Sequence, residues 1–393
     1  MAQEAPELLI DYIHWRGDLP LDLVPFNDVD NVILCELSYL DCSEVLHQMD
    51  TNGRTLREIY QEINKNDCFR LLTVIGGNED FVAAAANSER FGTLRMSHYL
   101  DEFDVEKMQF AAVHFELSPQ TSYIAFRGTD NSIIGWREDF MTGFTQNPGQ
   151  EMALHYLNVT MCRNRDYYLG GHSQGGNHAV YAASQLTPEQ QRHILRIYNN
   201  DGPEFSPDVY DIEKIDALKD KITKIVPAYD VIGQLFSRGI PDTKIVVSSQ
   251  SGFLQHDAVS WCLDGPKFKT QPNLDPAVKI INDTFRQWVE NAKPEERRAF
   301  VIQLFDGIEA QGAVTLEEVK LQDLKEVLKT MLSSSETARM VKDLPITYLN
   351  TARKYATEAI EQFAEETLQQ LNTKEKQTRE KEKQEKEDLK VKQ

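Results

Sequence analysis

A serine flanked by glycines lies in the stretch LGGHSQGGNHAVYAA, which spans residues 169–183. Gly171, Ser173 and Gly175 fit the pattern G-x-S-x-G, in which small residues let a strand turn sharply into a helix and expose the serine hydroxyl. The β-prone residues DYYLG precede this turn, and the helix-like residues NHAVYAASQL follow it. The helix N-terminus favours developing negative charge. The pattern predicts a nucleophile at Ser173, and the alternative is a glycine-rich structural turn.

A serine nucleophile needs a histidine base, and the base needs a carboxylate that orients it. His256 follows the β-rich run IVVSS by a loop and is the predicted base, whereas His193 lies where the next strand begins, at the far end of a parallel sheet. Asp230 and Asp201 both follow β-rich runs. We prefer Asp230 as the acid, because it follows the second strand after the nucleophile, and keep Asp201 in reserve. Either carboxylate could instead cap a turn.

An oxyanion hole needs two backbone N–H groups aimed at the developing charge. The residue after the nucleophile, Gln174, is predicted to supply one of them. The second is assigned to Thr129, in the loop after the strand-like run SYIAFRG, where Gly128 allows close backbone approach. The alternative reading of that loop is an ordinary turn at a strand end.

The surrounding sequence predicts the elements that position these residues. The runs MQFAAVHFEL and SYIAFRG flank SPQT and predict a hairpin, and later β-rich runs alternate with helical stretches. This alternation predicts an α/β fold with a mostly parallel sheet flanked by helices, and ligands bind at the carboxyl ends of such strands. Earlier, DNVILCELSYLD and DFVAAAANSERFGTLRMSHYLDEFD both have helix-like spacing.

Beyond about residue 275 the strand signals stop and amphipathic helices follow, one of them with Pro294 near its start and Gly312 after its end. We therefore predict an α/β domain over residues 1–290 and a helical C-terminal extension over 291–372. The highly charged residues 373–393 are predicted to be disordered or a solvated helix.

Composition argues against several functions. The net charge of −20 makes nucleic acid an unfavourable partner. Five cysteines without a C-x-x-C pair predict reduced thiols rather than disulfides or a zinc site. The chain shows neither the basic start and apolar region of a signal peptide nor an apolar run near the roughly 18 residues that span a membrane. We expect a cytoplasmic protein, with its oligomeric state left open.

Several motifs occur together in the order known from one group of enzymes. They are IAFRGTD, GWREDF, GGHSQGG, NNDGPEF, VPAYDVIGQL and QHDAVSW, preceded by DYIHWRGDLPLDLVPFNDVDNVILCELSYLD. Over roughly residues 8–310 the chain resembles a bacterial family of lipase-like α/β-hydrolases related to class 3, fungal-type lipases. The resemblance implies a triad of Ser173, Asp230 and His256, with Thr129 and Gln174 at the oxyanion hole. It supports Asp230 over Asp201, because Asp230 matches the acid position.

This resemblance implies hydrolysis of a small ester or a lipid through an acyl-enzyme, with no metal or cofactor. Class 3 lipases are typically secreted, and this chain shows no signal, so the substrate does not follow from the likeness. Three alternatives stay open: an acyltransferase or peptidase with the same triad; a membrane-acting phospholipase, exported without a cleaved signal; and a catalytically weak binding protein that recruits a partner through its C-terminal helices.

The segment after Thr129 corresponds to the lid of such lipases. Ile133, Trp136, Phe140 and Phe144 could form one apolar helix face there. We favour packing of this face against the sheet over a mobile lid.

Overall fold

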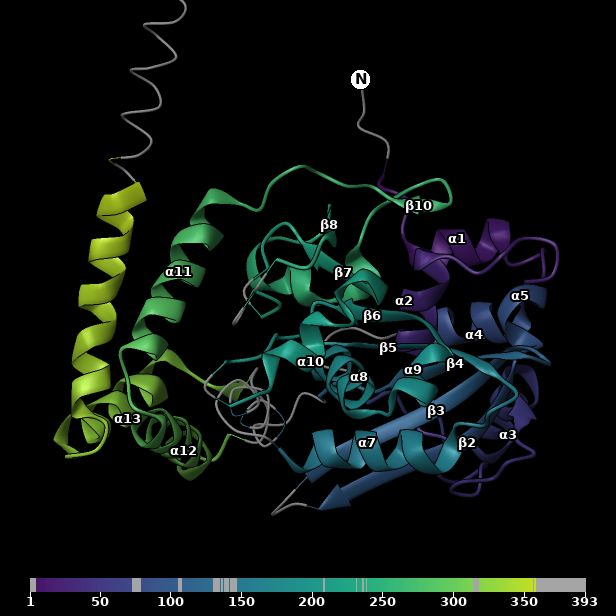
Figure 1. Cartoon of the computed structure of the whole chain (residues 1–393), viewed down its shortest axis with the longest axis horizontal. Coiled ribbons are helices and arrows are strands. Elements are labelled where there is room, and N and C mark those ends of the chain that lie inside the picture. Colours follow the sequence, from purple (N-terminus) through teal and green to yellow (C-terminus); the bar gives the residue numbers. More distant parts are fainter. Residues whose placement is uncertain are drawn as a thin grey trace, which may run out of the picture.

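An eight-stranded sheet forms the centre of the protein, and its strands follow one another in space in the same order as in the chain (Figure 1). The strands are β1 (Arg54–Thr55), β2 (Arg95–Asp104), β3 (Met108–Ser118), β4 (Thr121–Phe126), β5 (Asp166–His172), β6 (Ile194–Asn200), β7 (Ile222–Pro227) and β8 (Asp242–Val246). Neighbours are antiparallel from β1 to β4 and parallel from β4 to β8. The predicted hairpin is therefore confirmed as β3 and β4.

The computed structural model describes residues 5–72, 79–104, 108–129, 135, 137, 141, 147–207, 209–230, 232–234, 237, 239–313, 318–355 and 357. Its helices are α1 (Leu9–Arg16), α2 (Asp28–Leu37), α3 (Leu56–Asn66), α4 (Glu79–Asn87), α5 (Glu89–Gly92), α7 (Pro148–Thr160), α8 (Gln174–Gln185), α9 (Pro188–Arg192), α10 (Ile212–Asp216), α11 (Pro276–Glu290), α12 (Pro294–Ala310) and α13 (Leu321–Ser333). Short 3₁₀ turns cover Lys219–Lys221, Gly252–His256 and Ala258–Ser260, and a two-stranded ribbon joins β9 (Leu263–Asp264) to β10 (Lys267–Phe268).

Two hydrophobic clusters lie on opposite faces of the sheet. Along β3, Phe110 and Ala112 pack with α7 and α8, whereas Val113 and Phe115 pack with helices of the N-terminal region. This alternation is the period of two that a strand imposes on its side chains. Helices thus cover both faces, and the predicted class, an α/β-hydrolase-like fold with a helical C-terminal region, is confirmed.

Strand β2 corrects the sequence-based expectation for its segment. We expected helix through DFVAAAANSERFGTLRMSHYLDEFD, but only α4 and α5 are helical and the second half pairs with β3. The pairing register shifts between Ser97 and Leu100, where His98 has a φ of 51°. Such a bulge adds a residue and resets the alternation. Met96 and Tyr99, three apart as on a helix face, therefore enter the same cluster.

A buried ion pair anchors the N-terminal helices. Arg90 Nε and an Nη of Arg90 lie 2.7 and 2.5 Å from the two oxygens of Asp30, and both side chains are fully buried. The guanidinium also donates to the carbonyl oxygens of Leu19 and Val24. The pair therefore joins α2, α5 and the connection between α1 and α2.

Arg90→Leu is expected to destabilise the protein by about 3–5 kcal/mol, because it leaves the Asp30 carboxylate buried without its cation. The change in free energy is measured by urea unfolding against wild type. Arg54→Leu is the matched control: Arg54 pairs with Glu62 on the surface, so its loss should cost under about 1 kcal/mol. Equal effects of the two substitutions would contradict the prediction.

The C-terminal helices lie beside the α/β region and enclose a third hydrophobic cluster (Figure 1). Helix α12 begins at Pro294, and Gly312 beyond its end has a φ of 90°, as the sequence predicts. Trp288 of α11 packs in this cluster with residues of α12 and α13, although it precedes the predicted boundary at 290. A further helix covers residues 338–355, and the predicted tail, 373–393, lies outside the described residues.

Candidate active site

Ser173 lies at the sharp turn between β5 and α8. Its φ is 56°, an unusual value for a residue with a side chain, and the glycines on either side explain how the turn is accommodated. A Cβ at Gly171 would collide with the backbone of Gly175, and one at Gly175 would collide with the carbonyl of Phe126. The structure thus places the predicted glycines where only glycine fits.

Ser173, His256 and Asp201 form one hydrogen-bonded line. Ser173 Oγ lies 3.0 Å from His256 Nε2, and His256 Nδ1 lies 2.6 Å from Asp201 Oδ2. The three residues follow β5, β8 and β6, and each is at most 4% exposed. An imidazole between a hydroxyl and a carboxylate can accept the hydroxyl proton and be stabilised while it holds that proton.

The carboxylate that the structure places against His256 is Asp201, the residue held in reserve, and not Asp230, the preferred acid. Asp201 follows β6 directly, and its N–H donates to the carbonyl of Ile225 at 2.8 Å. Its φ of 55° turns the chain at the sheet edge. Asp230 stands three residues beyond the end of β7 and accepts from Gln234 Nε2 at 2.9 Å. It lies next to Asp201: a Cβ at Gly233 would be 2.6 Å from Asp201 Oδ1 and 3.0 Å from both oxygens of Asp230. When ionised, Asp230 would also act on the imidazole, since its charge raises the pKa of His256 against the larger effect of burial.

Burial opposes charge throughout this line of side chains. It lowers the pKa of His256 to about 4 and raises the pKa of Asp201 to about 6. Burial raises the pKa of Asp230 well above its ordinary value, and the neighbouring Asp201 charge adds to that rise. Neutral His256 is the form that a general base requires, and burial favours it.

The predicted oxyanion residues lie together beside the serine. A Cβ at Gly128 would be 3.2 Å from the Cβ of Ser173, so the loop after β4 passes close to the predicted nucleophile. Thr129 Oγ1 donates to Gln174 Oε1 at 3.2 Å, and both side chains are buried. This contact fixes the Thr129 loop to the first residue of α8, where the helix N-terminus favours negative charge.

Two supporting residues had no assigned role in the sequence analysis. His172 Nε2 donates to the carbonyl oxygen of His256 at 2.8 Å, and His172 Nδ1 lies 3.2 Å from the hydroxyl of Tyr39. Burial lowers the pKa of His172 to about 3, so it is neutral. Asn200 Nδ2 donates to the carbonyl oxygen of Gly171 at 3.1 Å. The only available signal was position, since both side chains come at the ends of strands.

The remaining predictions concern His193, the apolar face after Thr129 and the absence of a metal site. His193 Nδ1 lies 3.1 Å from Asp166 Oδ1 at the start of β5, so it is at the opposite end of the sheet from Ser173, as expected. The proposed apolar face of Ile133, Trp136, Phe140 and Phe144 lies outside the described residues. Within the described part of the chain, no cluster of three or more His, Cys, Asp or Glu side chains could hold a metal ion.

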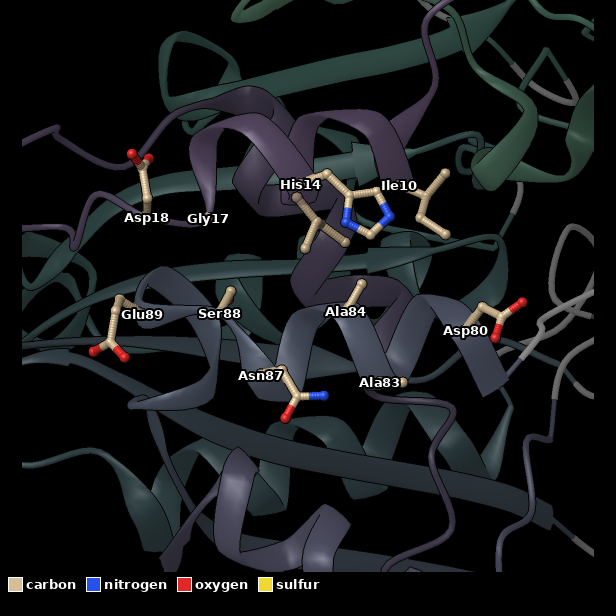
Figure 2. A pocket seen from close by; sticks show the side chains of 11 residues that line it. Ile10, His14, Gly17, Asp18, Asp80, Ala83, Ala84, Asn87, Ser88 and Glu89 are labelled. Atoms are coloured by element: carbon tan, nitrogen blue, oxygen red, sulfur yellow. The ribbon is translucent and has the colours of Figure 1, made fainter.

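A surface cavity of about 740 Å³ lies away from this site, between α1 and the α4–α5 region (Figure 2). Its 11 lining residues include His14, Asp18, Asp80 and Glu89, and none belongs to the line from Ser173 to Asp201. Among the described helices, none combines the length and the apolar character needed to cross a bilayer.

Known proteins resemble this chain in two ways. A family model described as Mbeg1-like matches residues 85–306, which is more than half of the chain. Lipase II from Rhizopus niveus is 12% identical, with a TM-score of 0.33, over 62% of this chain and 84% of the lipase. The Rhizomucor miehei lipase in its propeptide complex is 14% identical, with a TM-score of 0.33, over 57% of this chain and 72% of that one. No curated protein sequence matches the chain.

Proposed function

The chain belongs to the Mbeg1-like family, and we propose that it is a serine hydrolase that cleaves carboxylic esters through Ser173, His256 and Asp201. The observation that carries the proposal is the line of two hydrogen bonds, 3.0 Å from Ser173 to His256 and 2.6 Å from His256 to Asp201. The strained φ of Ser173 adds to it, because such strain occurs where a function requires that conformation.

The reaction would proceed through an acyl-enzyme. Ser173 Oγ attacks the acyl carbon while His256 Nε2 takes its proton, and the resulting imidazolium is stabilised by Asp201. The N–H groups of Gln174 and Thr129 would hold the oxyanion. The tetrahedral intermediate then expels the alcohol, which receives the proton from His256. Water repeats the sequence in the second half and releases the carboxylic acid.

The substrate would be a small ester or a lipid ester. A neutral acyl group suits this protein better than a polyanion, because the net charge of −20 repels phosphate-rich ligands such as nucleic acids. An ester chain-length series, with phospholipid vesicles and amide and acyl-acceptor substrates in parallel, distinguishes hydrolysis of soluble esters from phospholipase, peptidase and transferase activity.

Labelling by a fluorophosphonate tests the nucleophile without assuming a substrate. The phosphorus reagent should modify one serine, and mass spectrometry of the digested protein should locate the adduct on Ser173. Unfolding the protein before labelling should abolish the adduct, because the reaction depends on His256 lying within hydrogen-bonding distance. A folded protein that neither takes up the probe nor cleaves any ester of the series would rule out the proposed function.

The pH dependence follows from the buried His256–Asp201 pair. Catalysis requires neutral His256 and ionised Asp201, and the first proton that the pair gains removes this state. Because burial raises the pKa of Asp201 to about 6, kcat/KM should be high at pH 8 and should decline as the pH falls through about 6. Rates measured from pH 4 to 9 with one activated ester test this. A rise in kcat/KM towards acid pH would contradict it.

A further inference from the structure

Asp230 has no role in the proposed reaction, although its carboxyl group lies next to that of Asp201. From the arrangement of Asp201, Asp230 and Gly233 we infer that Asp230 is a neutral carboxylic acid that donates a hydrogen bond to Asp201 and so holds it against His256. The inference rests on the proposed function for its catalytic meaning, but the hydrogen bond itself can be tested without turnover.

Two charged carboxylates at this place would leave buried oxygens unsatisfied. As carboxylates, Asp201 and Asp230 each have a buried Oδ1 without a well-aligned hydrogen-bond donor among the described residues, although the N–H of Gly233 faces the Asp201 carboxylate and lowers its pKa. Both groups border the same point, the position that a Cβ of Gly233 would occupy, and they lie within hydrogen-bonding reach of each other. A single proton between them satisfies both oxygens, whereas two like charges at this separation repel.

The surroundings place that proton on Asp230. Asp201 Oδ2 faces Nδ1 of His256 at 2.6 Å, a charge-assisted contact that favours the ionised form of Asp201. Asp230 is fully buried, and its Oδ2 accepts from the neutral amide of Gln234 at 2.9 Å. Its remaining oxygen is thus free to carry the proton towards Asp201. The raised pKa of Asp230, caused by burial and by the Asp201 charge, agrees with this assignment.

Charged or titratable side chains face the pair from β7 and from the loop after β8, and α11 contributes a neutral one. Lys224 of β7 contacts Glu204 and the carbonyl oxygen of Gly233, so its charge is matched by Glu204. His256 follows β8 and is neutral in the resting state. From α11, Asn282 Nδ2 donates to the backbone carbonyl of Asp230 at 3.1 Å and brings no charge. With Asp230 neutral, one negative charge remains, on Asp201, to match the imidazolium formed during catalysis.

Gly233 explains how two side chains occupy this space. Any side chain at this position would enter between the carboxyl groups, because its Cβ would lie 2.6 Å from Asp201 Oδ1. The close approach therefore depends on the absence of a side chain there, and Asp230 acts as a positioning residue because it contacts Asp201 and not the reacting atoms.

Two substitutions at Asp230 separate hydrogen bonding from charge. Asp230→Asn keeps a neutral donor of the same shape, so kcat should stay within about threefold of wild type. Asp230→Ala removes the donor and frees Asp201 to turn, so kcat should fall by up to about 100-fold with KM little changed. The acid limb of the kcat/KM profile should coincide for wild type and Asp230→Asn, because neither carries a charge at residue 230.

Infrared spectroscopy tests the proton directly. Protein labelled with carbon-13 at aspartate carboxyl groups should show a protonated carboxyl band at pH 8 in wild type and in Ser173→Ala, and Asp230→Asn should remove it. Asp257→Asn is the matched control: burial raises the pKa of Asp257 only to about 6, so this variant should keep the band.

The two proposals can fail separately. If wild type shows the band but no ester hydrolysis or probe labelling, the carboxyl pair stands and the enzymatic function is wrong. If the band is the same in wild type and Asp230→Asn, the inference is wrong whatever the activity. A shift of the acid limb to lower pH in Asp230→Asn would also overturn it, because it would show that Asp230 carries a charge that favours protonation of His256.

Discussion

Ser173→Ala should lower kcat for ester hydrolysis by about 10⁶-fold, the loss expected when the nucleophile of a working triad is removed. The expected effect is large because the substitution removes the covalent route and not merely one contact. The fold should be retained, since the positive φ of Ser173 is set by the glycine contacts around the turn and alanine adds no atoms. Steady-state hydrolysis of an activated ester, with fluorophosphonate labelling in parallel, measures the loss.

Ser184→Ala provides the matched control for that experiment. Ser184 is also buried in α8, but its hydroxyl donates to the carbonyl oxygen of Tyr181 at 2.7 Å, one helical turn away, and takes no part in the line to His256. It should hydrolyse the ester at the wild-type rate. Equal rates for Ser173→Ala and wild type would show that any hydrolysis comes from another group or from a contaminant.

Asp201→Asn should lower kcat by about 10⁴-fold, as expected when a triad carboxylate becomes an amide. An asparagine can donate to Nδ1 of His256, which favours the tautomer with its proton on Nε2 and leaves no acceptor for the proton of Ser173. The loss should appear in kcat more than in KM, because Asp201 lies behind His256 and away from the acyl group. Burst and steady-state kinetics with an activated ester separate the two.

Asp257→Asn is the control for this second loss. Asp257 follows His256 in sequence, but its carboxylate accepts from the N–H of Val259 at 3.3 Å and caps the short turn that follows. Its replacement should leave kcat close to wild type. If Asp201→Asn kept its activity and Asp230→Asn lost it, the acid would be Asp230, as the motif order suggested, and the geometry described above would not be the working one.

The serine and the histidine were predictable because their signals are local. The glycines around Ser173 are required by the turn itself, and His256 is the histidine in the loop after the last parallel strand. The hairpin and the parallel strands followed from alternation and spacing in the same way. Strand β2 was not predicted, because the bulge at His98 places Met96 and Tyr99, three residues apart, in the same cluster. That spacing is typical of a helix, and nothing in the composition of the segment indicates a bulge.

The carboxylate that contacts His256 could not be chosen from the sequence, because Asp201 and Asp230 both follow parallel strands at the carboxyl edge of the sheet. Which of the two aspartates contacts His256 depends on the path of the chain after each strand. Asp201 turns immediately with a φ of 55°, and a Cβ at the following Gly202 would meet the carbonyl oxygen of Ser173. Asp230, by contrast, comes three residues after the end of β7. An aspartate followed by glycine directly at a strand end was the available signal for Asp201, but the order of the motifs favoured Asp230.

The strand order also has a consequence for how the protein is made. Because each strand adds beside its predecessor, pairing can proceed as the chain leaves the ribosome, with little loop entropy to overcome at each step. The N-terminal helices differ, since Leu9 and Tyr12 complete their cluster with Trp261 and Leu263. Those contacts span most of the α/β region, and long-range contacts of this kind form slowly. His256 lies just before Trp261 in the chain, so the residue that contacts Ser173 adjoins the segment against which the N-terminal helices pack.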